Sequence, residues 1–407
     1  MISQPREHIE AALGEGRSGI RIIGLETLIV NANLRNWVFV KVTTNEPGLH
    51  GWGESSLEWR TRSVAGALSD VAPLVIDQDP LRIEHLWQSL YRHHFFKGGA
   101  VTMSAISGID QALHDIAGKF HGVPVFSLLG GRVRDHVRFY DHLGGGSPDL
   151  VYGNDLDAGH FAELAKESVS AGFDAIKLLP VPPTAMLEGQ AGPRLAAERL
   201  AAVRDAVGDD VDVMVDMHGR TTPAMAIRYA RELEPHNPWF LEEPCQPENV
   251  EAMARVSRST SIPIAAGERV YTRFGFRPLL EQAACSIIQP DVCHCGGLTE
   301  MKKIAAMAET YFVSVAPHNP LGPIATMANL HFALSTSNFL IQEVMRADVP
   351  WRDDVAGNEL QISGGCAMPP LLPGLGIEID EKAAAQHPFR PETEIRTFHA
   401  DGGVADW

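Results

Sequence analysis

The chain has 407 residues, a formal net charge of −17 and 45% hydrophobic residues. This negative charge repels phosphate backbones and anionic lipids, so neither nucleic acid nor a membrane surface is an expected partner. No stretch approaches the roughly 20 uninterrupted apolar residues that a membrane span requires, and the first residues lack the apolar core of a signal peptide, so we expect a cytoplasmic protein.

The five cysteines are odd in number and scattered, which indicates reduced thiols. The segment Cys293-His294-Cys295 has no second Cys/His pair that would complete a zinc site.

Residues 1–136 predict an α+β domain. The strand-like segments RIIGLETLIV and NWVFVKVTT come first, the chain turns at HGWGES, and a helical pattern runs through SAISGIDQALHDIAGKF. Strands followed by helices, without alternation, are typical of an α+β arrangement. A chain of this length also exceeds what one core usually supports, so we expect a second domain to follow.

Residues 137–350 alternate between short apolar runs and helical patterns, which indicates repeated βα units around a parallel sheet. The eight runs suggest a closed barrel, and they read VRFYDH, DAIKLL, VDVMVD, WFLEE, IPIAAGE, SIIQPD, FVSVAPH and FLIQE. Between two of them, Thr222 and Pro223 predict the start of a helix that ends near Pro235. The segment PVPPTAMLEGQAGP predicts a long mobile loop.

Residues 351–407 contain no helical pattern of barrel length. The strand-like segment GLGIEID in this tail is expected to pair back onto the first domain.

Six of the predicted strands end in, or run directly into, an ionisable residue. In a parallel barrel all such ends open on one face, where catalytic groups collect. A single residue of this kind is more often a helix cap or a structural histidine, but equivalent positions on consecutive strands favour a shared site. These residues are Asp216, Glu242, Glu268, Asp291, His318 and Glu343.

Asp216, Glu242 and Glu268 would repel one another on neighbouring strands unless a cation lay among them. Mg²⁺ prefers a few carboxylate oxygens and keeps positions for water or substrate. The sequence therefore predicts a magnesium site here. Glu243 is left out because strand alternation sends it to the opposite side.

The remaining groups predict proton transfer. Residues two apart on a strand face the same way, so His218 is expected to reach over the same mouth as Asp216. Asp291 and His318 end consecutive strands, which favours a carboxylate–imidazole general base. A protonated Glu343 would be able to donate a hydrogen bond to a developing enolate oxygen.

These segments, from HGWGES through VDMHGR, FLEEP, AAGERVYTRFGF, IIQPDVCHCGGLTE and APHNPLGPIA to PGLGIEID, resemble the enolase superfamily, in particular acid-sugar dehydratases of the mandelate racemase subgroup similar to galactonate and mannonate dehydratases. The resemblance implies an α+β capping domain, completed by the C-terminal segment, over a modified (β/α)7β TIM barrel. It implies homo-oligomers as well. Enolase-superfamily sites pair a Lys or His base with Mg²⁺. By resemblance the ligands are Asp216, Glu242 and Glu268, the base dyad is His318 with Asp291, the general acid is His218, and Glu343 stabilises the enediolate.

Related racemases carry Lys-x-Lys at the end of the second strand, whereas this chain has Lys177-Leu178-Leu179. Because leucine cannot move a proton, this difference favours a dehydration with one base and one acid. Lys177 itself is expected to face the site and contact substrate, or else to pack structurally at the barrel rim. By resemblance, the segments NANLRNWV and RHHFFKGGAV match the capping-domain loops that select substrate. By resemblance to mannonate dehydratases, Asn36, in the first of these segments, and His142, in FYDHLGG, are expected to contact substrate.

The sequence thus predicts Mg²⁺-dependent dehydration of an aldonate, such as galactonate, mannonate or gluconate, to a 2-keto-3-deoxy sugar acid. The alternatives are a cycloisomerase or epimerase of a related acid and a catalytically silent family member. A zinc amidohydrolase would need His-x-His on the first barrel strand, where FYDHLGG offers one histidine.

Overall fold

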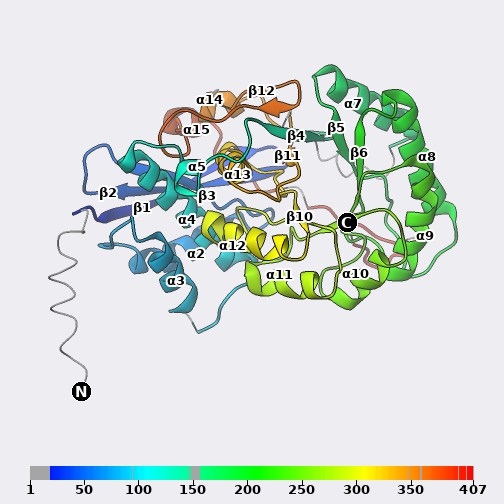
Figure 1. Cartoon of the computed structure of the whole chain (residues 1–407), viewed down its shortest axis with the longest axis horizontal. Coiled ribbons are helices and arrows are strands. Elements are labelled where there is room, and N and C mark those ends of the chain that lie inside the picture. Colours follow the sequence, from blue (N-terminus) through cyan, green and yellow to red (C-terminus); the bar gives the residue numbers. More distant parts are fainter. Residues whose placement is uncertain are drawn as a thin grey trace.

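The computed structural model describes residues 19–93, 95–145, 147, 156–346, 348–357, 360–392, 394–399 and 401–406. An antiparallel sheet with its helices lies beside a barrel that helices surround (Figure 1). Both predicted architectures, α+β in the N-terminal part and βα repeats after it, are confirmed. Among the described residues, none of the helices combines the length and the apolar character that a membrane span needs.

The N-terminal sheet has the order β1-β2-β3, with strands β1 (Ile22–Ala32), β2 (Arg35–Thr44) and β3 (His50–Glu54). Its helices are α2 (Thr61–Val71), α3 (Ile83–Arg92), α4 (Ala100–His121), α5 (Val125–Leu128) and the 3₁₀ helix η2 (Ala72–Leu74). Helix α4 is buried along most of its length and packs on β3. The contact is close because a Cβ atom on Gly53 would lie 1.9 Å from the carbonyl oxygen of Gly108. We call this part the capping domain.

The barrel strands run parallel from β4 to β11. Strand β11 pairs with β4, and a bridge between Val315 and Phe339 joins the β10 and β11 segments, which closes the barrel. The strands are β4 (Val137–His142), β5 (Ala175–Leu178), β6 (Asp212–Asp216), β7 (Leu241–Glu242), β8 (Ile264–Ala266), β9 (Ile287–Ile288), β10 (Ser314–Val315) and β11 (Gln342–Val344).

A helix connects each barrel strand to the next, which is the (β/α)7β arrangement. The helices are α7 (Ala158–Ser170), α8 (Ala191–Val207), α9 (Pro223–Leu233), α10 (Val250–Ser257), α11 (Thr272–Glu281), α12 (Gly297–Glu309) and α13 (Pro323–Leu334), with the 3₁₀ helix η3 (Glu234–His236) after α9. The predicted start of α9 is confirmed, because the Thr222 side chain accepts a hydrogen bond from the Met225 N–H. The Pro-rich segment forms the irregular connection between β5 and α8, except that its end, from Ala191, already belongs to α8.

The C-terminal segment returns to the capping domain. It includes α14 (Arg352–Ala356), β12 (Ile362–Ser363), β13 (Cys366–Ala367) and α15 (Glu381–Ala384), drawn in orange and red in Figure 1. Strand β13 pairs antiparallel with the start of β4. The expected strand at GLGIEID does not form: Gly374 makes an isolated bridge to Pro124, and the Leu375 N–H donates to the Asp115 carboxylate at 2.8 Å. The segment therefore packs on α4 and α5 without joining the capping sheet.

Candidate active site

Apolar side chains fill the centre of the barrel, one from each strand or its edge. Because side chains alternate along a strand, the residues two positions further on point into the barrel again and form the next layer. The apolar layer is Tyr140, Ala175, Met214, Phe240, Ala265, Ile287, Ala316 and Ile341. The next layer is polar, apart from one glycine, and consists of His142, Lys177, Asp216, Glu242, Gly267, Gln289, His318 and Glu343.

Three carboxylates meet at this polar layer. Asp216, Glu242 and Glu268 each offer one oxygen, and these three atoms lie within 4.8 Å of one another. Asp216 and Glu242 end β6 and β7, as predicted, but Glu268 lies two residues beyond the end of β8. Gly267, at φ 139°, turns the chain there. The expected convergence of the triad is present in the structure.

The buried Lys177 ammonium, on β5, lies among carboxylates of three other barrel strands. Its Nζ lies 2.8 Å from Glu242 Oε2, 2.7 Å from Glu343 Oε1 and 3.7 Å from Asp216 Oδ2. Lys177 thus faces the site, but its donors are engaged by protein carboxylates. Contact between Lys177 and substrate stays a prediction.

The residues of the triad fit a divalent cation. Burial raises the pKa of Glu242 well above its usual value, and the negative charges of Asp216 and Glu343 raise it further against the opposing effect of Lys177. Burial also raises the pKa of Glu268, with Glu243 and Asp216 adding to the effect. One lysine balances a single negative charge in this cluster, so a cation with oxygen preference would relieve the remaining repulsion.

The predicted pairing of His318 with Asp291 is present, and the role of the pair as a base stays a prediction. His318 Nδ1 lies 2.7 Å from Asp291 Oδ2, and its Nε2 lies 3.7 Å from Glu268 Oε2. Burial alone would lower the pKa of His318, but the hydrogen bond to Asp291 and the charges of Glu343 and Asp291 raise it to about 9. With Nδ1 bound to Asp291, Nε2 is the atom that can exchange a proton with a substrate.

The turn after β6 places His218 differently from the expectation. The strand ends at Asp216, so the alternation argument does not apply to His218, which adopts a left-handed conformation at φ 52°. The His218 N–H donates to Asp216 Oδ1 at 2.7 Å, which fixes the turn. The side chains of Asp216 and His218 still line the same cavity, as expected, but the turn brings them together and not strand alternation.

Glu243 is not part of the triad and does not line the inner or mouth cavity, as expected, but strand alternation is not the reason. Strand β7 ends at Glu242, and Glu243 takes a left-handed conformation at φ 37°. Its buried carboxylate pairs with Arg269, whose side chain lines the mouth of the barrel. Glu243 thus holds Arg269 beside the site.

The surroundings of Glu343 favour its ionised form, in contrast to the protonated form considered from the sequence. Burial raises the pKa of Glu343, but Lys177, His318 and His142 outweigh that effect and hold it at about 2. Its Oε2 also accepts a hydrogen bond of 2.7 Å from the Asn319 N–H. Its role toward an enediolate stays a prediction, and in that role Glu343 would have to gain a proton against its lowered pKa.

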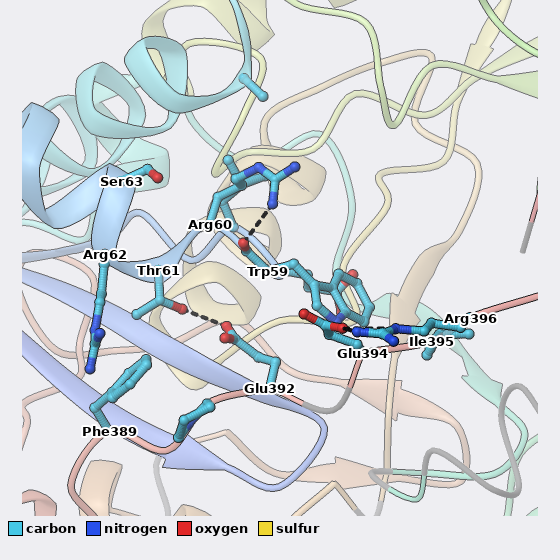
Figure 2. Close-up of a pocket in the computed structure, with 14 residues that line it drawn as sticks. Trp59, Arg60, Thr61, Arg62, Ser63, Phe389, Glu392, Glu394, Ile395 and Arg396 are labelled. Atoms are coloured by element: carbon cyan, nitrogen blue, oxygen red, sulfur yellow. Dashed lines mark hydrogen bonds and ion pairs between the residues drawn. The ribbon is translucent and has the colours of Figure 1, made fainter.

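Three adjoining cavities open at the barrel mouth. An inner cavity of about 40 Å³ is lined by His142, Lys177, Leu179, Asp216, His218, Glu268, His318, Pro320, Glu343, Met345 and Glu58. A mouth cavity of about 270 Å³ shares Glu58, His218, Glu268 and His318 with it and adds residues such as Arg269 and His294. An outer cavity of about 680 Å³, drawn in Figure 2, continues past Leu57, Glu58 and Trp59 to the C-terminal segment.

The two predicted substrate contacts differ in their surroundings. His142 is buried and lines the inner cavity, its Nδ1 has no hydrogen-bond partner among the described residues, and burial and Lys177 lower its pKa to about 3. Asn36 instead donates through Nδ2 to the Arg390 carbonyl at 2.8 Å and accepts the Arg390 N–H at 3.1 Å. It does not line the inner or mouth cavity. Contact with substrate stays a prediction for both residues.

Glu58 and Arg269 border the site although the sequence did not single them out. Both lie in loops, where no strand or helix periodicity assigns a direction to a side chain. The turn expected at HGWGES is not present, because His50–Glu54 form strand β3, and Glu58 lies in the loop that follows it. Leu179, by contrast, lines the inner cavity at the position where the sequence noted a missing proton carrier. Cys293 and Cys295 are free, buried thiols.

The chain matches known families and proteins along most of its length. Residues 160–383 match the family described as enolase C-terminal domain-like, and residues 25–130 match the mandelate racemase/muconate lactonizing enzyme N-terminal domain. It is 43% identical to a D-galactonate dehydratase of Ralstonia pickettii (strain 12J) over 91% of this chain and 96% of that protein. A D-galactonate dehydratase of Cronobacter sakazakii is 40% identical over the same shares.

Solved structures share the fold. An enolase superfamily member from Salmonella Typhimurium superposes with a TM-score of 0.84 and 34% identity, covering 91% of this chain and 98% of that one. An enolase from Agrobacterium radiobacter with bound Na and L-malate gives a TM-score of 0.85 and 31% identity, covering 95% of this chain and 100% of that one.

Proposed function

This chain belongs to the mandelate racemase/muconate lactonizing enzyme family of the enolase superfamily, and from that premise we propose that it dehydrates an aldonate such as galactonate, mannonate or gluconate to a 2-keto-3-deoxy sugar acid. One observation carries the proposal: Asp216 and Glu268 of the carboxylate triad line an inner cavity together with His318 and His218, and Leu179 lies at the position of a second base. The similarity to D-galactonate dehydratases supports the same substrate class.

His318 removes the proton from the carbon next to the substrate carboxylate, through Nε2. Asp291 keeps the imidazole oriented and stabilises its charged form after transfer. The electron pair of the broken C–H bond forms the enediolate and then the new carbon–carbon double bond. The hydroxyl on the next carbon leaves as water with a proton from His218, and the enol product tautomerises to the keto acid.

Asp216, Glu242 and Glu268 are the residues that would hold Mg²⁺, the metal we propose for this site. When bound, the ion supplies Lewis-acid stabilisation of negative charge on the substrate carboxylate. Lys177 keeps Glu242 and Glu343 in place through direct contacts. Restoration of activity to EDTA-treated protein by a series of divalent ions tests the choice of metal, and light scattering tests the self-association that the family resemblance suggests.

The substitution His318→Asn tests the base. Because the amide cannot accept the proton, we expect kcat for keto-acid formation to fall at least about 10²-fold on whichever C5 or C6 aldonate the unaltered protein turns over. Exchange of the α-proton with solvent should be lost as well. Undiminished turnover by this variant would contradict the assignment of His318.

A cycloisomerase or epimerase of a related acid is the alternative within the same family. Such an enzyme converts its substrate without forming a keto acid, so semicarbazide detection of the product separates the two reactions. A silent family member would bind the metal but turn over no acid in the same screen.

A further inference from the structure

Glu58 stands where the three cavities meet. It follows β3 in the capping domain and lines the inner, mouth and outer cavities. The barrel contributes most of the inner cavity's lining, including Lys177 and Asp216, at strand ends. A sugar acid whose carboxylate lies at these strand ends therefore extends its far end toward the capping domain, where Glu58 lies.

Arg35 lies behind Glu58 and is almost fully buried. Its NH1 is 2.8 Å from Glu58 Oε1, with side-chain exposures of 4% for Arg35 and 20% for Glu58. The guanidinium also donates to the Pro320 carbonyl and to Met345 Sδ. Glu58, Pro320 and Met345 line the inner cavity, whereas Arg35 does not. The Glu58 carboxylate thus presents a negative charge to the cavity and separates the positive charge of Arg35 from it.

Glu58 retains capacity to bind a hydroxyl. Its Oε1 is buried against Arg35 and makes no directed hydrogen bond among the described residues, while the side chain as a whole is 20% exposed and lines the cavity. A carboxylate in this state accepts a hydrogen bond from a neutral hydroxyl and repels a second carboxylate, and partial burial strengthens both effects.

We propose that Glu58 makes this site select aldonates, whose far end is a neutral hydroxymethyl group, and reject aldarates, whose far end is a second carboxylate. The proposal rests on the sugar-acid dehydratase function above and specifies its substrate class. It uses a repulsive element for discrimination, as specific sites commonly do. Removal of the Glu58 carboxylate uncovers Arg35, and a guanidinium pairs with a carboxylate through two hydrogen bonds.

The experiment compares galactonate with galactarate, which share every stereocentre and differ at the terminal carbon. The measured quantity is the ratio of kcat/KM for the aldonate to that for the aldarate in the unaltered protein, Glu58→Gln and Glu58→Ala. We expect the ratio to fall at least about tenfold in both variants, an effect on the order of 1.4 kcal/mol. Most of the change should be a gain with galactarate. The milder Gln variant serves if the Ala variant does not fold.

Two controls separate the causes. Glu394→Gln removes a carboxylate that pairs with Arg396 on the outer cavity (Figure 2) but does not line the inner cavity, and it should leave the ratio unchanged. The double variant Arg35→Met/Glu58→Ala should lose the gain with galactarate. An unaltered ratio in both Glu58 variants, with full aldonate turnover by the unaltered protein, overturns this inference alone, whereas absence of any sugar-acid turnover by the unaltered protein overturns the proposed function.

Discussion

His318 links the chemistry of the site to its stability at the scale of one residue. Its pKa rises from an ordinary 6.5 to about 9 in the folded protein, through the hydrogen bond to Asp291 and the nearby carboxylate charges. The folded state therefore holds this proton more tightly than the unfolded state. The resulting stabilisation is complete below about pH 6.5 and disappears as the pH rises through about 9.

We predict this loss for protein stripped of divalent ions. The free energy of unfolding should decrease between about pH 6 and pH 9.5 by about 3 kcal/mol more in the unaltered protein than in His318→Asn, which has no such proton. Urea titrations of both proteins at the two pH values measure the difference. Equal pH dependence of the two proteins would contradict the shift.

At the scale of single residues, the sequence predicted which side chains come together, but not always the backbone conformation that brings them together. The carboxylates and His318 could be chosen because ionisable groups recur at successive strand ends. His218 and Glu243 could not be oriented, because a left-handed residue after each strand replaces the alternation on which the expectation depended. Glu58 required the packing of one domain on the other, which no local pattern encodes.

At the scale of elements, the turn after β8 decides where the third carboxylate points. Alternation would direct residue 267 into the barrel, but this residue is a glycine at φ 139°, and the carboxylate follows it. A Cβ atom at Gly267 would lie 2.7 Å from Phe276 Cε1 and 3.1 Å from the Gln289 nitrogen. The turn therefore has no room for a side chain.

Gly267→Ala should displace Glu268 and weaken metal binding. We expect the dissociation constant for the divalent ion, measured by calorimetry, to rise at least about tenfold, because one of three protein ligands is misplaced. Gly66→Ala is the matched control, since an added Cβ in α2 meets nothing within 4 Å. Unchanged affinity in Gly267→Ala would show that Glu268 does not depend on this turn.

The lengths of the elements were less predictable than their order. Apolar runs such as SIIQPD and FVSVAPH predicted full strands, but β9 and β10 each contain two residues. Buried irregular chain needs the same apolar residues as a strand, so composition does not separate the two. The start of α9 was predictable because Thr222 and Pro223 act locally.

At the scale of the whole molecule, the C-terminal segment ties the parts together. Asn36 of β2 binds the backbone of Arg390 on both sides, the Asn31 N–H donates to the His387 carbonyl, and the Glu378 carboxylate accepts from Trp52 Nε1 at 2.9 Å. Glu54 of β3 accepts from the N–H groups of Gly322 and Ala325 at the start of α13, which joins the capping domain to the loop after His318. Sequence patterns predicted the return of the tail but none of these contacts, because each joins residues remote in the chain.

Asn36→Ala should loosen this segment. Loss of both hydrogen bonds to Arg390 should speed amide hydrogen exchange in residues 387–392, with little change in KM, if the role of Asn36 is to anchor the backbone. Exchange mass spectrometry and steady-state kinetics on the same variant measure the two quantities. A raised KM with unaltered exchange would instead support the substrate contact that the family resemblance suggests for Asn36.

Leu179 affects the configuration at the α-carbon of sugar acid that is recovered unreacted from the enzyme. An enediolate can regain a proton at its α-carbon before the neighbouring hydroxyl leaves. His318 can return this proton to the face from which it was removed, whereas Leu179 has no proton to donate to the opposite face. Unreacted acid isolated from heavy water should therefore carry deuterium without inversion.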